Sequence, residues 1–167
     1  MKKAFYILFI AVVGIACLKP KDLPIEPVIE SVTFFPNADS TGTMLIKFTD
    51  GDGDLGLAEA DTFPPFNPGN KYNSNLFFNY YEFQNGVWKH IVNIDNETGD
   101  TINPFSYRVP TLETDGKDKT LEGEIEIDMP FIYFDPFSKF DSLRFEIELY
   151  DRALNKGTAT TRVILKP

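Results

Sequence analysis

Residues 76–94 read LFFNYYEFQNGVWKHIVNI, two apolar and aromatic runs joined by the dipeptide Asn85-Gly86. Asn-Gly supplies the two positive φ angles of a type I′ turn, a preferred two-residue connection of β-hairpins. A two-residue turn also fixes the register of the two strands, so Gln84 is expected to face Val87, with each earlier residue facing the next later one. The stretch therefore predicts a fold built on antiparallel β-structure.

Both faces of this hairpin are rich in rings, because side chains alternate between them. One face is expected to carry four residues together, namely Tyr81, Phe83, Trp88 and His90. Rings on an exposed sheet face combine apolar area with polar tips, which suits them to stack on sugars or to hold a protein partner. The alternative is that these rings fill the core. The four residues are a candidate ligand-binding platform if their face is outward.

Short segments of alternating polar and apolar residues follow one another after residue 28. Further strands are expected at residues 28–34, 44–49, 105–109, 121–129, 143–150 and 159–165. In the last of these, the alternation places Ala159, Thr161, Val163 and Leu165 on one face. Seven or eight short antiparallel strands predict one all-β domain over residues 28–167, an immunoglobulin-like β-sandwich, with a small β-barrel as the alternative.

The composition sets the size of the core and the sign of the surface charge. The chain has 167 residues, of which 43% are hydrophobic, enough for one sizeable core and a single domain. Its formal net charge is -9, with 16 basic and 25 acidic residues. Such a charge excludes electrostatically driven binding to nucleic acid, and cations or a basic partner suit it better.

Residues 1–16 have the pattern of a cleaved signal peptide. Two lysines precede an apolar run at residues 4–13, which is too short to span a bilayer, and small residues lead to the only cysteine, Cys17. A lone cysteine cannot form an internal disulfide, which favours Cys17 as a lipid attachment site. Residues 17–27 then form the lipidated cysteine and a short proline-rich tether. An ordinary secretory signal with an incidental cysteine is the alternative.

Three aspartates at every second position follow the strand at residues 44–49, in the stretch FTDGDGDLGL at residues 48–57. Glycine lets the backbone curl, and carboxylate oxygens are the ligands that Ca²⁺ takes. An EF-hand loop starting at Asp50 would need glycine at its sixth position, where Leu55 stands, and glutamate at its twelfth, where Asp61 stands. Because the flanking elements are strands, an EF-hand is excluded.

A site built from two loops is the remaining possibility for a cation. In an immunoglobulin-like sandwich, the loop after the second strand and the loop before the last strand lie at the same end. The candidate Ca²⁺ ligands are therefore Asp50, Asp52, Asp54, Asp151 and Asn155. Clustered carboxylates without a cation repel one another. Solvent and salt would screen that repulsion if the stretch were only an exposed acidic turn, which is the alternative.

The chain resembles small cell-envelope lipoproteins of Bacteroidota that carry an Ig-like domain. The resemblance lies in the lipoprotein signal, the short tether, IKFTDGDGDLGL at residues 46–57 and ELYDRALNKGTATTRVIL at residues 148–165. It implies a location in the cell envelope, as an outer membrane lipoprotein facing either the periplasm or the outside. It also implies a non-enzymatic binding or structural role, without naming a ligand.

The residues themselves give little support for catalysis. The chain has one histidine, His90, and no free thiol once Cys17 is lipidated. It also lacks a glycine-rich phosphate loop and a histidine-rich metal set. We therefore expect a membrane-anchored, non-catalytic structural or protein-interaction module, stabilised by Ca²⁺. The alternative is an accessory glycan-binding lipoprotein of a polysaccharide-uptake system.

Overall fold

The computed structural model describes residues 23–112, 119–131 and 138–165. The predicted signal peptide, Cys17 and the first residues of the tether lie outside these ranges. The described chain contains one short 3-10 helix and eleven strands. The elements are β1 (Val28–Pro36), β2 (Gly42–Asp50), η1 (Lys71–Asn73), β3 (Leu76–Gln84), β4 (Val87–His90), β5 (Asn93–Ile94), β6 (Thr101–Ile102), β7 (Ser106–Tyr107), β8 (Leu121–Met129), β9 (Ser142–Tyr150), β10 (Lys156–Thr160) and β11 (Ile164–Leu165).

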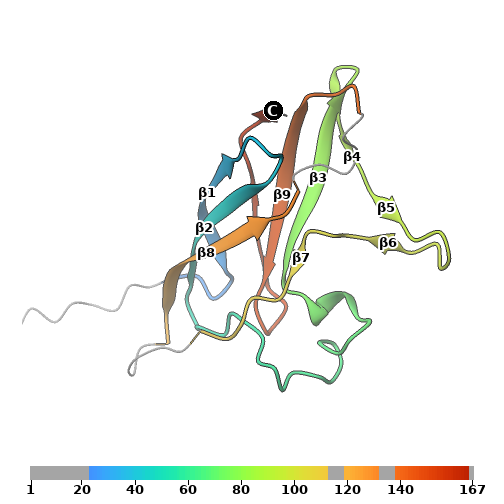
Figure 1. Ribbon diagram of the computed structural model, residues 1–167. Helices are drawn as coiled ribbons and strands as arrows, with labels where there is room; N and C mark the ends of the chain where they lie inside the picture. The colour runs from blue at the N-terminus through green and yellow to red at the C-terminus, as the bar shows by residue number, and fades with distance from the viewer. Residues whose placement is uncertain (1–22, 113–118, 132–137, 166–167) are drawn as a thin grey trace, which may run out of the picture.

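The main strands form two antiparallel sheets, which confirms the predicted β-sandwich (Figure 1). One sheet has the order β1-β2-β8, and the other has the order β10-β9-β3-β4, with β7 and β11 added to β3 and β9. This division of β1, β2 and β8 from β3, β4, β9 and β10 is that of an immunoglobulin-like sandwich. The sheets are not closed on each other, so the β-barrel alternative is wrong.

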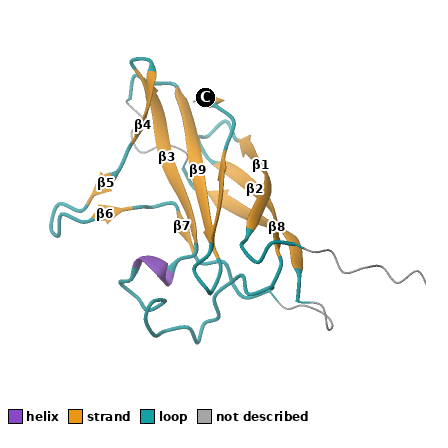
Figure 2. Cartoon of the chain, turned by 180° about the vertical axis from the view of Figure 1, so that it is seen from behind, coloured by secondary structure: helices purple, strands orange, loops and turns teal. Residues whose placement is uncertain are grey.

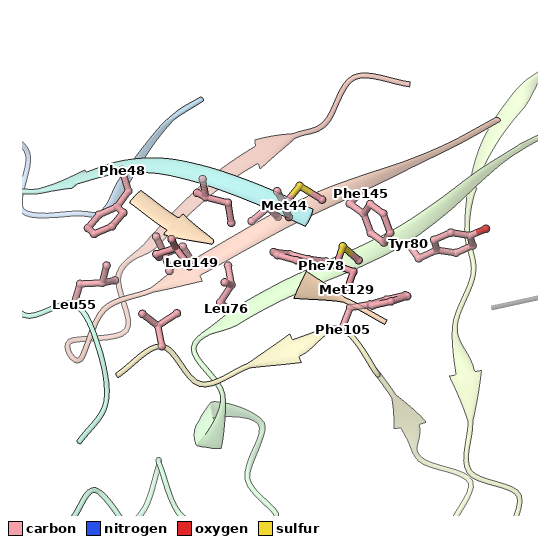
Figure 3. Packing of buried hydrophobic residues seen from close by; sticks show 14 of the residues in the cluster. Met44, Phe48, Leu55, Leu76, Phe78, Tyr80, Phe105, Met129, Phe145 and Leu149 are labelled. Carbon is pink, nitrogen blue, oxygen red and sulfur yellow. The ribbon is translucent and has the colours of Figure 1, made fainter. Parts of the chain in front are cut away.

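The core lies between the two sheets and is built from the inward positions of both (Figure 3). In β2, Met44, Ile46 and Phe48 are buried. Met44 lies beside Phe78 and Phe145 of the other sheet. The alternation seen in the sequence therefore marks the core face in these strands.

The β3–β4 hairpin has the register that its turn predicts. Gln84 pairs with Val87, and Asn85 and Gly86 have φ angles of 53° and 83°. The second strand ends at His90, earlier than the apolar pattern suggested. Ile91 still donates its N–H to the Tyr80 carbonyl at 2.9 Å. Residues 92–102 then leave the sandwich and form a projecting arm with the two-residue strands β5 and β6 (Figure 2).

The last predicted strand is broken in two, and the expected common face is wrong. Val163 and Leu165 are 57% and 65% exposed, whereas Ile164 is buried. The reason is an irregularity after β10, where the Thr161 hydroxyl accepts a hydrogen bond from the Phe145 backbone N–H at 3.0 Å. The chain resumes pairing as β11 with its alternation reversed, because one extra residue exchanges the two faces of a strand.

Candidate cation site and aromatic cluster

The loop after β2 is tightly packed and depends on glycine. Gly53 and Gly56 have φ angles of +68° and +103°, which side chains rarely adopt. A Cβ atom on either residue would overlap a backbone carbonyl, that of Lys119 for Gly53 and that of Pro110 for Gly56. Leu55 is fully buried in the core. The loop is therefore a fixed part of the sandwich rather than a solvent-exposed turn.

Two loops bring three carboxylates together at this end of the sandwich. Asp50 ends β2, and Asp151 follows β9 directly and forms an isolated bridge with Leu55. One oxygen from each of Asp50, Asp54 and Asp151 lies within 4.8 Å of the others. Asp50 is 0% and Asp151 is 1% exposed, so solvent does not screen their charges.

Hydrogen bonds satisfy one side of this cluster and leave the other side open. Asp50 Oδ2 accepts the Leu55 N–H at 2.9 Å, and Asp54 accepts from backbone N–H groups of the loop after β9. Three buried oxygens accept no hydrogen bond from any described residue, namely Asp50 Oδ1, Asp52 Oδ1 and Asp54 Oδ1. A buried carboxylate oxygen without a partner is costly and points to a ligand or a proton at that position.

No basic side chain within the described ranges forms an ion pair with this cluster. The nearest arginine in sequence, Arg152, instead binds both carboxylate oxygens of Asp61, at 2.6 and 2.9 Å. Burial, together with the neighbouring aspartates, raises the pKa of Asp50 to about 6. Burial and the charge of Asp151 also raise the pKa of Asp54. The site therefore has excess negative charge at neutral pH and favours a cation or a proton.

The five residues predicted from the sequence have different positions. Asp50, Asp54 and Asp151 converge, with one oxygen of each within 4.8 Å of the others. Asp52 lies beside them and is not part of this group. Asn155 is turned toward Asp151, to which it donates its backbone N–H at 2.7 Å and its Nδ2 at 2.8 Å. Asn155 therefore orients a candidate ligand rather than facing the open side of the cluster.

The cluster has the chemistry of a site for a hard cation. Carboxylate oxygens from separate loops are typical Ca²⁺ ligands, and carbonyl oxygens or water complete the coordination. Described residues offer no cysteine or histidine at this cluster, so it does not resemble a zinc site. A shared proton is the other way in which the mutual repulsion can be relieved.

The four rings of the candidate platform lie on the outward face of the second sheet. Tyr81 stacks on His90 with ring centroids 4.9 Å apart, and Phe83 contacts Trp88 at 5.2 Å. Phe83 is 42% exposed, while the inward residues of β3, such as Tyr80, fill the core. The alternative that these rings form the core is wrong, because the turn register places them on the opposite face.

One residue of this aromatic cluster was not predicted from the sequence. The guanidinium of Arg144 lies 4.6 Å from the Trp88 ring centroid and 5.4 Å from that of Tyr81. It pairs with Tyr81 across β3 and β9, and no sequence signal fixes a pairing over that separation. Arg144 covers part of the ring surface, so the platform is less open than four free rings would be.

A polar hollow of about 380 Å³ lies on the same sheet face. It is lined by residues of three adjacent strands that include Asn79, Glu146, Glu148, Lys156, Thr158 and Thr160. Its volume is within the range of small-ligand sites, and its groups can donate and accept hydrogen bonds.

The fold and the acidic cluster define the class of this protein as an antiparallel β-sandwich domain with converging carboxylates at one end. No protein-family model matches the chain, and neither curated proteins nor solved structures gave a significant match. Among the described residues, no helix is long and apolar enough to cross a membrane.

Proposed function

We propose that this protein is a Ca²⁺-stabilised, non-catalytic module of the cell envelope that acts as a structural or protein-interaction domain. The observation that carries the proposal is the unpartnered Asp50 Oδ1, fully buried beside the carboxylates of Asp54 and Asp151. A divalent cation neutralises this charge and joins the loops after β2 and β9.

Thermal unfolding with and without Ca²⁺ tests this role. Extracellular modules bind Ca²⁺ with dissociation constants of about 0.1–1 mM, so a few millimolar Ca²⁺ should raise the melting temperature by about 5 °C relative to EDTA. Mg²⁺ should raise it less, because Mg²⁺ demands a smaller and more regular set of ligands.

A matched pair of variants identifies the carboxylate responsible. Asp54→Asn removes one converging charge with little change in shape, and it should abolish the Ca²⁺-dependent shift. Asp100→Asn, in the exposed arm, removes the same charge elsewhere and should leave the shift unchanged. An equal midpoint in Ca²⁺ and in EDTA for the unsubstituted protein would refute the proposal.

Attachment to the outer membrane through Cys17 is the second part of the proposed function. The signal-like residues 1–16, the cysteine that follows them and the short tether support it. A lipid anchor keeps the sandwich near the membrane, where a structural or interaction module of the envelope acts.

Glycan binding is the second candidate function, favoured by the outward rings and the adjacent polar hollow. Sugars stack on ring faces and hydrogen-bond to groups such as Asn79 and Glu146. A glycan array with the full chain tests this role, and any hit should weaken at least tenfold in His90→Ala, since each lost contact of about 1.4 kcal/mol gives that factor. Binding that is indifferent to His90→Ala and Trp88→Ala would place the sugar elsewhere.

A further inference from the structure

The described end of the tether, Leu23–Pro27, runs across the loops that carry the candidate cation ligands. Pro27 is buried and Leu23 is half-buried, while Ile25 between them is 55% exposed. The segment is therefore held at two points, with an exposed span between them. One point is a glycine of the loop after β2, and the other is a glycine of β10, the strand that follows the second loop.

The first of these points is Gly51, which lies between Asp50 and Asp52. Its N–H donates to the Pro24 carbonyl at 2.8 Å. A Cβ atom at Gly51 would overlap the carbonyl oxygens of Leu23 and Pro24. The tether therefore packs directly on the backbone that presents the first carboxylate.

The second point is Gly157 in β10, two residues after Asn155. A Cβ atom there would overlap the Pro27 carbonyl oxygen. Gly157 also pairs with Leu149, close to the end of β9 where Asp151 follows. The tether thus contacts the loop after β2 through Leu23 and Pro24, and it contacts the start of β10 through Pro27, just before β1 begins.

We infer that the cation site is a clamp on the tether, so that Ca²⁺ binding fixes how the sandwich leaves its N-terminal anchor. The inference rests on the proposed Ca²⁺ role. Of the three converging carboxylates, those of Asp50 and Asp151 are buried and that of Asp54 is half-buried. Without a cation they repel one another, which drives apart the Asp50–Gly51 segment and the loop after β9. The tether packs on Gly51 and on Gly157 at the start of β10, directly after the loop that follows β9. A separation of the two loops therefore loosens the tether, and a cation that joins them restores the contacts.

Spin labelling measures this coupling in the full chain. In a Cys17→Ser background, Ile25→Cys places the only thiol on the exposed span of the tether, and a nitroxide there reports its local mobility. Adding CaCl₂ to EDTA-treated protein should slow the rotation of this label about threefold, as expected when a loosely held segment becomes fixed. The control label is at Val87→Cys, which is 53% exposed at the far end of the sandwich and should not respond (Figure 1).

A glycine substitution separates the clamp from the cation site. Gly157→Ala introduces the overlap with Pro27 without altering a carboxylate, so the Ile25 label should stay mobile in Ca²⁺ while the Ca²⁺-dependent rise in melting temperature persists. Gly123→Ala is the control, because its Cβ would make only an ordinary contact with the Phe48 ring at 3.4 Å.

The two proposals fail in different ways. If Ca²⁺ raises the melting temperature but the label at Ile25 keeps its mobility, the clamp is overturned and the stabilising role stands. If Ca²⁺ changes neither quantity, the stabilising role itself is refuted, and the clamp with it.

Discussion

Asp50 shows how one buried carboxylate can be both built into the fold and left with a free oxygen. Its Oδ2 closes the loop by accepting the Leu55 N–H, which a local turn needs. Its Oδ1 has no such structural role among the described residues and lies beside two other carboxylates. A residue chosen for the loop alone could be asparagine, which would avoid the repulsion. The presence of a charged residue here, rather than asparagine, supports the proposed cation.

The raised pKa of Asp50 gives the metal-free protein a defined pH dependence. Because the folded-state pKa is about 6 against 3.8, the folded protein holds the proton more tightly. The stability from this group is present below about pH 4 and is lost as pH rises through 6, about 3 kcal/mol in all. Urea unfolding in EDTA should therefore show that wild type loses stability relative to Asp50→Asn between pH 4 and pH 7.

The comparison with Asp50→Asn removes the pH-dependent stability contributed by other carboxylates, some of which acts in the opposite direction. The Arg152 guanidinium lowers the pKa of Asp61, so the stability from that carboxylate is lost as pH falls. Asp61 is present in both proteins, and its effect cancels in the difference. A difference that is flat between pH 4 and pH 7 would show that Asp50 is ionised freely in the fold.

Gly53 and Gly86 illustrate two reasons why a position requires glycine, a positive φ angle and the lack of space for a Cβ atom. Both have positive φ, +68° and +83°, but only Gly53 has a backbone atom in the place of a Cβ. Gly86→Ala should cost about 1 kcal/mol of unfolding free energy from backbone strain alone. Gly53→Ala should cost at least about 3 kcal/mol, because Lys119 and the loop must also move. Equal losses in urea unfolding would mean that the loop yields easily.

At the scale of elements, Thr161 accounts for the break between β10 and β11. Its hydroxyl takes the hydrogen bond of the Phe145 N–H that a ladder carbonyl would otherwise accept. Thr161→Val leaves that buried N–H unpaired and should lower the unfolding free energy by about 1–3 kcal/mol. Thr161→Ser keeps the hydroxyl and should cost less, and Thr158→Val, exposed in β10, should be near neutral. Calorimetric unfolding of the three variants measures the order.

The sequence predicts elements well where local chemistry alone sets them. The Asn85-Gly86 turn fixes two φ angles and the whole register, and strict alternation marks the inward faces of β2, β8 and β9. The prediction fails where a contact between residues far apart in the sequence determines the structure. The alternation in residues 159–165 is overridden by the bond between Thr161 and Phe145, and β4 ends early although the apolar residues continue.

The same limit applies to the candidate site. In an immunoglobulin-like sandwich, the loops after β2 and β9 lie at the same end, and the order of the strands in the sequence predicts this. Which oxygens converge depends on side-chain rotamers, so the different placements of Asp52 and Asn155 could not be read from the sequence. The tether contacts at Gly51 and Gly157 could not be predicted either. In the second contact, Pro27 and Gly157 are more than a hundred residues apart in the sequence.

At the scale of the molecule, the two candidate sites occupy different parts of the sandwich. The acidic cluster lies at the end where β2 and β9 finish, beside the N-terminal tether, and the rings lie near the opposite tip of the hairpin (Figure 1). The proposed clamp beside the tether therefore lies away from the aromatic face and does not cover it. Cation binding and partner binding can then act on the same molecule independently.

The whole-molecule charge makes the lipid anchor testable. A net charge of -9 opposes binding to anionic membrane surfaces, so the proposed membrane attachment depends on a lipid on Cys17 rather than on electrostatics. In cells given labelled palmitate, the wild-type protein should incorporate label and remain in the membrane pellet after a high-salt wash. Cys17→Ser should incorporate none and move to the soluble fraction. Because this substitution leaves the sandwich unchanged, the variant should keep the proposed Ca²⁺-dependent rise in melting temperature. Palmitate incorporation that survives Cys17→Ser would sink the lipoprotein assignment, because the chain has no second cysteine to carry the lipid.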